Sequence, residues 1–98
     1  MELSIKWNRR AINQFDEAIA YIENDSPASG EKVKEDILLK IGALLTHPQR
    51  HKPDRYKTGN DNSFRAFKIH HYRISYRYKG NEIRIIRIRH TKMNPLKY

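Results

Sequence analysis

The chain has 98 residues, 38% of them hydrophobic and 32% charged, with no cysteine and a formal net charge of +9. A chain of this length and composition forms one folded domain, residues 1–98, whose core needs no disulfide, and no apolar stretch is long enough for a signal peptide or a membrane span. These limits predict a cytoplasmic domain with no membrane partner, and the positive charge favours a polyanionic partner such as RNA or DNA.

The first elements in the chain are predicted to be a short strand and a helix. Leu3, Ile5 and Trp7 alternate with polar residues, which is typical of a strand with one buried face. Residues 9–24 predict a helix, because apolar residues recur there at intervals of three or four. The members of this apolar stripe are Ile12, Phe15, Ile19 and Ile22.

A second helix is predicted to follow Ser26, which is suited to be its cap, with Pro27 in the first helical position. It should end before Pro48, because the residue ahead of a proline avoids the helical conformation. Its inner face is predicted to carry Val33, Ile37, Ile41, Leu44 and Leu45. The polar residues 48–62 then predict an exposed loop, and a loop of that length is often functional.

Three strands are predicted in the second half, at residues 64–69, 71–79 and 82–89. Together with the first strand and the helical hairpin they predict an α+β fold, in which this mainly antiparallel segment completes one curved sheet. In the middle strand the alternation places tyrosines on the helix side and arginines on the opposite side. In the last strand the alternation changes phase, which a β-bulge or burial on both faces would explain.

The positive charge is confined to the second half of the chain. Residues 50–98 contain 14 Lys or Arg against three acids, whereas residues 1–49 contain 6 against 8. A solvated face normally mixes both signs, so this imbalance predicts a cationic sheet face that meets solvent and binds phosphate, although the same bases could serve only to keep the protein in solution. The predicted phosphate or nucleic-acid contacts are Arg65, Arg77, Arg87, Arg89 and Lys92.

The order of elements and several short motifs resemble the RelE/ParE family of toxins from bacterial type II toxin-antitoxin systems. The motifs are Asp25-Ser26-Pro27 between the helices, Pro48, Phe64-Arg65, His71-Tyr72-Arg73-Ile74-Ser75-Tyr76, and Arg87-Ile88-Arg89-His90 with Pro95 and Tyr98. The resemblance implies a small α+β toxin, without a cofactor, that is neutralised by a cognate antitoxin. Its target would be either ribosome-bound mRNA, cut without a metal, or DNA gyrase, which it would poison. The basic half predicts an acidic or an apolar and acidic antitoxin segment.

Cleavage of RNA requires a base for the 2′-hydroxyl, an acid for the leaving oxygen and fixed cations at the phosphate. His90 can exchange a proton near neutral pH, Tyr98 could donate one if the tail folds back, and Arg73 could hold the phosphate together with Arg65 and Arg89. The family resemblance points to Arg73, His90 and Tyr98 as the catalytic positions. The remaining histidines show no spacing that suits a metal site.

Alternatives stay open at each step. Arg65 and Arg73 could instead be held by helix acids such as Asp16 or Glu17, and His90 could be a hydrogen-bonded surface residue. The long helical hairpin resembles the ParE branch, which acts on gyrase, whereas His90, Tyr98 and the arginines match the RNA-cutting branch. A basic nucleic-acid-binding or adaptor domain without toxicity is the third hypothesis.

Overall fold

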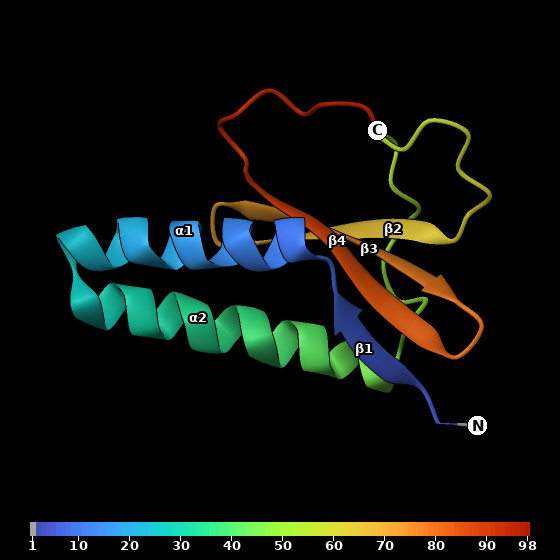
Figure 1. The fold of residues 1–98 in the computed structure, drawn as a ribbon, viewed down its shortest axis with the longest axis horizontal. Helices are drawn as coiled ribbons and strands as arrows, with labels where there is room; N and C mark the ends of the chain where they lie inside the picture. The colour runs from blue at the N-terminus through green and yellow to red at the C-terminus, as the bar shows by residue number, and fades with distance from the viewer. Residues whose placement is uncertain (1) are drawn as a thin grey trace.

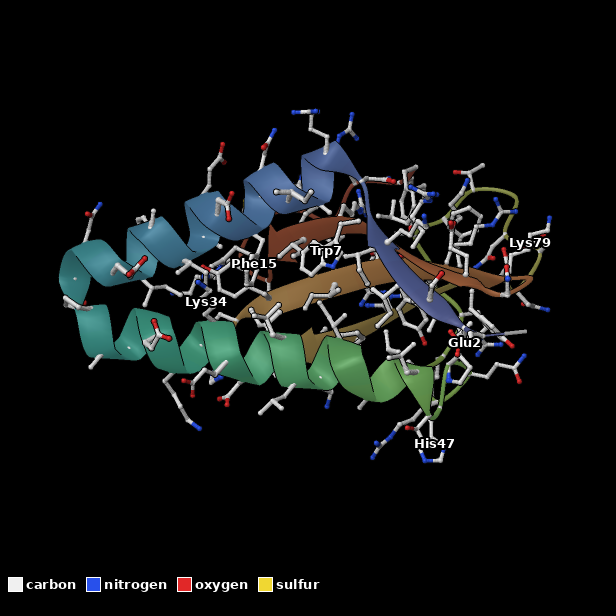
Figure 2. The ribbon with its side chains drawn as sticks, turned by 60° about the horizontal axis from the view of Figure 1, so that its bottom comes forward. Glu2, Trp7, Phe15, Lys34, His47 and Lys79 are labelled. Atoms are coloured by element: carbon white, nitrogen blue, oxygen red, sulfur yellow. The ribbon has the colours of Figure 1, made fainter. Side chains whose placement is uncertain are left out.

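The computed structural model describes residues 2–98, in which a helical hairpin packs on one face of a four-stranded sheet (Figures 1 and 2). The elements in chain order are β1 (Ser4–Trp7), α1 (Arg9–Asp25), α2 (Pro27–Gly42), the 3-10 turn η1 (Ala43–Leu45), β2 (Phe64–Ile69), β3 (Tyr72–Lys79) and β4 (Glu82–His90). The strands lie in the order β1-β4-β3-β2, with β1 parallel to β4 and the other neighbours antiparallel. The predicted α+β fold is therefore confirmed. Neither α1 nor α2 is long and apolar enough to cross a membrane, and residues 2–98 contain no other helix that is.

Local sequence sets the ends of the two helices. The Oγ of Ser26 accepts a hydrogen bond from the Ser29 N–H at 3.2 Å, and Pro27 occupies the first turn of α2. The N–H of Ser26 also donates to the carbonyl of Ile22 at 2.8 Å, which closes the end of α1. One serine thus ends the first helix and caps the second, as the sequence predicts.

The core lies between the hairpin and the sheet. Trp7 and Phe15 meet edge to face with ring centroids 5.4 Å apart, between α1 and the strands (Figure 2). The predicted inner stripes are wrong at two positions, because Ile12 is 44% exposed and Leu45 is 47% exposed. Ala11 is fully buried in place of Ile12, and the change from α2 to the tighter η1 alters the number of residues per turn just before Leu45.

A β-bulge explains the change of phase in the last strand. Ser75 pairs with Arg87 while the next residue, Tyr76, pairs with Ile85, so Ile86 is an extra residue in β4. Beyond the bulge the alternation is shifted by one. Isoleucines on both sides of the bulge consequently face the helices, and the arginines of β4 face the other way.

The turn between β2 and β3 differs from the prediction. His71 was expected to begin the third strand, but His70 and His71 form the turn, and His70 has φ of 54°. This left-handed conformation is uncommon for a residue with a side chain. The Nε2 of His70 lies 2.8 Å from Oδ2 of Asp36, which links the turn to α2.

The segment before β2 is only partly an exposed loop. Pro53 forms a bridge with Arg65, the Asp54 N–H donates to the Phe64 carbonyl at 2.8 Å, and the Ala66 N–H donates to the Lys52 carbonyl at 3.3 Å. These hydrogen bonds lie along β2, the last strand of the sheet order. The loop therefore covers part of an edge that would otherwise present unpaired backbone groups.

Gly30 allows the two helices to approach closely. A Cβ added at Gly30 would lie 2.3 Å from Cγ of Glu23 and 3.3 Å from its Cα, whereas a Cβ at Gly42 would meet nothing within 4 Å. We expect Gly30→Val to lower the free energy of unfolding by about 2 kcal/mol through overpacking. Gly42→Val, in the same helix, should stay within about 0.5 kcal/mol of the unmodified protein. Urea unfolding of both variants measures the difference, and equal values would contradict the close approach.

Candidate functional site: the basic face of the sheet

The face of the sheet opposite the helices carries rows of basic residues. Directly opposed residues of antiparallel strands share a face, and Lys68 opposes Arg73, which in turn opposes Arg89. Four residues further along β3, Arg77 opposes Arg84. The alternation therefore groups the bases as predicted, and we call this surface the basic face.

Arg65 does not belong to the basic face. It opposes Tyr76, whose side chain is fully buried in the core, so Arg65 lies on the helix side at the edge of the sheet. Its guanidinium donates to the backbone carbonyls of His51 at 2.6 Å and Gln49 at 3.4 Å. Arg65 therefore lies apart from the other predicted phosphate contacts, and its guanidinium bonds to the loop and not to the helix acids.

The chain's last residues cover the basic face. Residues 91–98, here called the strap, pass over β4 and end beside the loop that precedes β2 (Figure 1). Arg89 donates to the Asn94 carbonyl at 3.0 Å, and Arg87 donates to the Leu96 carbonyl at 2.5 Å. The N–H of Tyr98 donates to the Tyr56 carbonyl at 3.0 Å. The expected solvent-open cationic face is therefore wrong, because the arginines of its centre are bound to the protein's own backbone.

A buried aspartate lies at the centre of this covering layer. The side chain of Asp54 is fully buried, and its Oδ1 accepts hydrogen bonds from Arg73 Nη2 at 2.9 Å and from the Tyr56 N–H at 3.1 Å. Its Oδ2 accepts from the Ser75 hydroxyl at 2.9 Å and the Tyr98 hydroxyl at 2.6 Å. One carboxylate thus joins the loop, β3 and the strap.

These contacts shift the ionisation of the groups involved. Burial alone would raise the pKa of Asp54, but the hydrogen bonds from Tyr98, Arg73, the Tyr56 N–H and Ser75 outweigh it, and the pKa lies below its ordinary value. The pKa of the Tyr98 phenol is strongly raised, mainly by burial and also by its hydrogen bond to Asp54. The aspartate is consequently an anion at neutral pH, and the phenol keeps its proton.

The structure brings Arg73 and Tyr98 together at Asp54, whereas the His90 side chain has other partners. Arg73 and Tyr98 both contact Asp54, and the Arg87 guanidinium lies 4.1 Å over the Tyr98 ring. His90 instead opposes Tyr72, on the helix side of β4. Its ring meets the Tyr72 ring at 5.2 Å, and its Nδ1 accepts from the Lys92 N–H at 3.0 Å.

The remaining predicted contacts lie at the margins of the covered area. Arg77 donates to the Ser63 hydroxyl at 3.0 Å, lies 3.8 Å from Asp61 and stacks at 4.6 Å over Phe64. Lys92 is exposed at the start of the strap. Among residues 2–98 there is no cluster of three or more His, Cys, Asp or Glu that could hold a metal ion.

Sequence reasoning missed Asp54, Tyr56 and Ser75. A signal for the first was present, because Asp54 is one of only three acids among the last 49 residues. A lone acid among many arginines is more readily explained as an internal ion-pair partner than as part of a solvated surface. Ser75 gave no such signal, since a serine on the polar side of a strand is ordinary.

Comparison with known proteins identifies the family. A family model described as the ParE toxin of the type II toxin-antitoxin system, parDE, matches residues 5–95. The chain belongs to the ParE toxin family. The resemblance noted in the sequence is thereby confirmed, with the match on the ParE side of the RelE/ParE group.

Two similar proteins support this assignment. A solved structure, the chromosomal ParDE TA system from P. aeruginosa, matches with a TM-score of 0.70 over 92% of this chain and 97% of that chain, at 22% identity, which shows a shared fold. A protein of Sinorhizobium fredii named "Putative toxin Y4kP" is 37% identical over 54 residues. That match spans 55% of this chain and 56% of the relative, so it covers about half the length of each.

Removing the charge of Asp54 in this ParE-family chain should destabilise the fold. Asp54→Asn leaves Arg73, 18% exposed in its side chain, without its carboxylate partner, and breaking a buried pair in this way is expected to lower the free energy of unfolding by about 3 kcal/mol. Asp61→Asn is the matched control, because Asp61 is exposed and its ion pairs are long. Urea unfolding should place the control near the unmodified protein, and an equal loss in both variants would contradict the central role of Asp54.

The lowered pKa of Asp54 also predicts a pH dependence. A carboxyl group whose pKa is lower in the folded state stabilises the protein above its unfolded pKa, about 3.9, and this stabilisation is lost as the pH falls through the folded pKa. The free energy of unfolding should therefore fall between about pH 5 and pH 2, and less steeply in Asp54→Asn. Unfolding of Asp54→Asn and of the unmodified protein at several pH values tests this. Identical slopes in Asp54→Asn and the unmodified protein would refute it.

Proposed function

We propose that this chain is the toxin of a type II toxin-antitoxin pair and that it inhibits DNA gyrase by binding, without cutting RNA. Membership of the ParE family supports the first part. The observation that carries the second part is the state of the predicted catalytic residues, because Arg73 and Tyr98 are both bound to Asp54.

The chemistry of RNA cleavage explains why this matters. A general acid must give up its proton and a general base must accept one, each within hydrogen-bond reach of the reacting groups. The Tyr98 hydroxyl donates a hydrogen bond to Asp54, and the raised pKa of the phenol keeps the proton on Tyr98. His90 lies on the helix side of the sheet and accepts a hydrogen bond from the strap. In this conformation Tyr98 and His90 are held by different partners, which does not favour an acid and a base that act on one phosphate.

The form of the helical hairpin also favours the gyrase hypothesis. The helices α1 and α2 have 17 and 16 residues, and a long hairpin of this kind resembles the ParE branch. A poison that acts by binding needs surface area and no catalytic groups. Gyrase and translating ribosomes both lie in the cytoplasm, where we also place this protein.

Cleavage of mRNA remains the second candidate, and one observation favours it. Lys68, Arg73 and Arg89 form an in-register row across three strands, and such a row could hold a phosphate if the strap moved away. A non-toxic nucleic-acid-binding or adaptor domain is the third possibility, and a growth assay separates it from both.

The proposed partner is a cognate antitoxin with an apolar and acidic segment. A groove beside α1 offers a place for it, since Tyr21, which is 75% exposed, lines this groove together with Ala18, Met93 and Lys92. Apolar side chains of the partner would cover Tyr21 and Met93, and its acids would meet Lys92. Because the strap already covers the basic face, the antitoxin is proposed to bind here and not across the arginine rows.

Assays of gyrase and of mRNA in parallel test the proposed activity. Induced expression should arrest growth, the purified protein should stop supercoiling or cause cleaved DNA to accumulate, and mRNA in a translating extract should stay whole. His90→Ala should inhibit gyrase as strongly as the unmodified protein, because His90 has no chemical part in the proposal.

The opposite pattern would overturn the proposal. Unaffected gyrase together with mRNA cleavage that His90→Ala or Arg73→Ala weakens by orders of magnitude would establish the nuclease. Harmless expression of folded protein would remove both toxin hypotheses.

A further inference from the structure

A small cavity lies between the basic face and the strap. Its volume is about 140 Å³. Its lining combines the sheet residues Lys68, Arg73, Arg87 and Arg89 with His90 at the end of β4 and Met93 of the strap. No acid lines it, and the nearest carboxylate contact is the bond between Arg73 and Asp54.

The cavity holds more positive charge than the surrounding protein neutralises. Lys68, Arg73 and Arg89 oppose one another directly in the sheet, and like charges in such positions repel. Within residues 2–98, Asp54 is the one acid in contact with these three basic residues. Each of its two carboxylate oxygens already accepts two hydrogen bonds. The carbonyls that bind Arg87 and Arg89 satisfy N–H groups but carry no formal charge.

Two guanidinium groups at the cavity also keep unused donors. The Nε atoms of Arg73 and Arg89 are buried and have no hydrogen-bond partner among residues 2–98. Because these two atoms are buried, an anion in the cavity would contact the terminal Nη groups of the two arginines and not their Nε atoms. Burial also lowers the pKa of Arg87, and neighbouring Arg89 and Arg73 lower it further, against the opposing effect of Tyr98 and Asp54.

We infer that this cavity binds a single tetrahedral oxyanion, namely a phosphate group. Guanidinium groups present several N–H donors that match phosphate oxygens, and a charged acceptor would counter the repulsion along the row Lys68, Arg73 and Arg89. The volume suits one small group, since an apolar cavity of about 150 Å³ holds a benzene molecule, whereas pockets for drug-sized ligands begin at about 300 Å³. A whole nucleotide therefore does not fit beneath the closed strap.

The bound anion would also hold the strap in place. Arg87 and Arg89 line the cavity and at the same time donate to the strap carbonyls of Leu96 and Asn94. Fixing these two side chains fixes their partners in the strap. This site is independent of the proposed action on gyrase, because it requires neither gyrase nor an antitoxin.

Titration of the unmodified protein with inorganic phosphate tests the site directly. Phosphate should raise the melting temperature by about 5 °C or more at a tenfold excess over its dissociation constant, and potassium chloride at the same ionic strength should not. The ³¹P resonance of phosphate should broaden or shift in the presence of the protein. An equal response to phosphate and chloride, with an unchanged ³¹P signal, overturns the inference.

Charge-neutral variants locate the bound anion. Lys68→Gln and Arg89→Gln should each weaken phosphate binding about tenfold or more, whereas Lys6→Gln, an exposed lysine on β1, should not. Lys68 is exposed at the mouth of the cavity, so its variant should fold even if Arg89→Gln does not. Unchanged binding in folded Lys68→Gln overturns the assignment to this cavity.

A competition experiment distinguishes the two sources of the phosphate group. A short single-stranded oligonucleotide without a terminal phosphate is added to the protein bound to inorganic phosphate. Displacement of inorganic phosphate from the unmodified protein, absent in Lys68→Gln, would assign the site to a nucleic-acid phosphate reached after the strap opens. Retention of inorganic phosphate would assign it to the free anion, which is the result we expect with the strap closed.

Discussion

The buried carboxylate of Asp54 holds together the loop before β2 and the strap, which form the layer that covers the basic face. A buried charge is unfavourable unless opposite charge and hydrogen-bond donors surround it, and Asp54 receives its donors from Arg73 and Ser75 of β3, from the Tyr56 N–H and from the Tyr98 hydroxyl. These groups come from segments far apart in the sequence. They must all be in place together, so the loop before β2 and the strap are ordered by the same interaction that neutralises Arg73.

This layer changes the chemical character of the sheet's outer side. Backbone carbonyls of the strap accept from Arg87 and Arg89, and Arg87 is buried beneath the strap while its charge remains. The result is a positively charged interior whose arginines meet carbonyl groups without formal charge. A phosphate-sized anion suits such a place better than an extended nucleic acid does, since a nucleic acid needs an open groove along several bases.

The two sides of the molecule consequently suit different partners. The strap side is closed and charged, whereas the helical hairpin keeps apolar side chains in contact with solvent, among them Ile12, Tyr21 and Leu39. Exposed apolar groups of this kind are the usual material of protein interfaces. For a member of the ParE family this division fits action through protein contacts made on the hairpin side, with the strap side serving the stability of the toxin itself.

Much of the fold follows from the sequence because it depends on local patterns. The cap at Ser26, the end of α2 before Pro48 and the alternation in β3 are set by neighbouring residues, and the structure has each of them. The predicted burial of Ile12 and Leu45 was wrong because burial depends on how closely a helix approaches the sheet and on the tighter turn of η1. The spacing of apolar residues along a helix predicts neither feature. The predicted start of a strand at His71 was wrong for a related reason, since His70 adopts a left-handed conformation that the sequence does not favour.

The sequence by itself determined that positive charge would gather on the outer face of the sheet, because side chains of a strand alternate and β3 places its arginines at every second position. Only the tertiary structure decided what that face does. Whether Arg73 meets solvent or Asp54, and whether Tyr98 lies over Arg87 or away from it, depends on where a loop and a strap return to the sheet. Such long-range contacts arise from packing and the neutralisation of buried charge, and no spacing between residues along the chain specifies them.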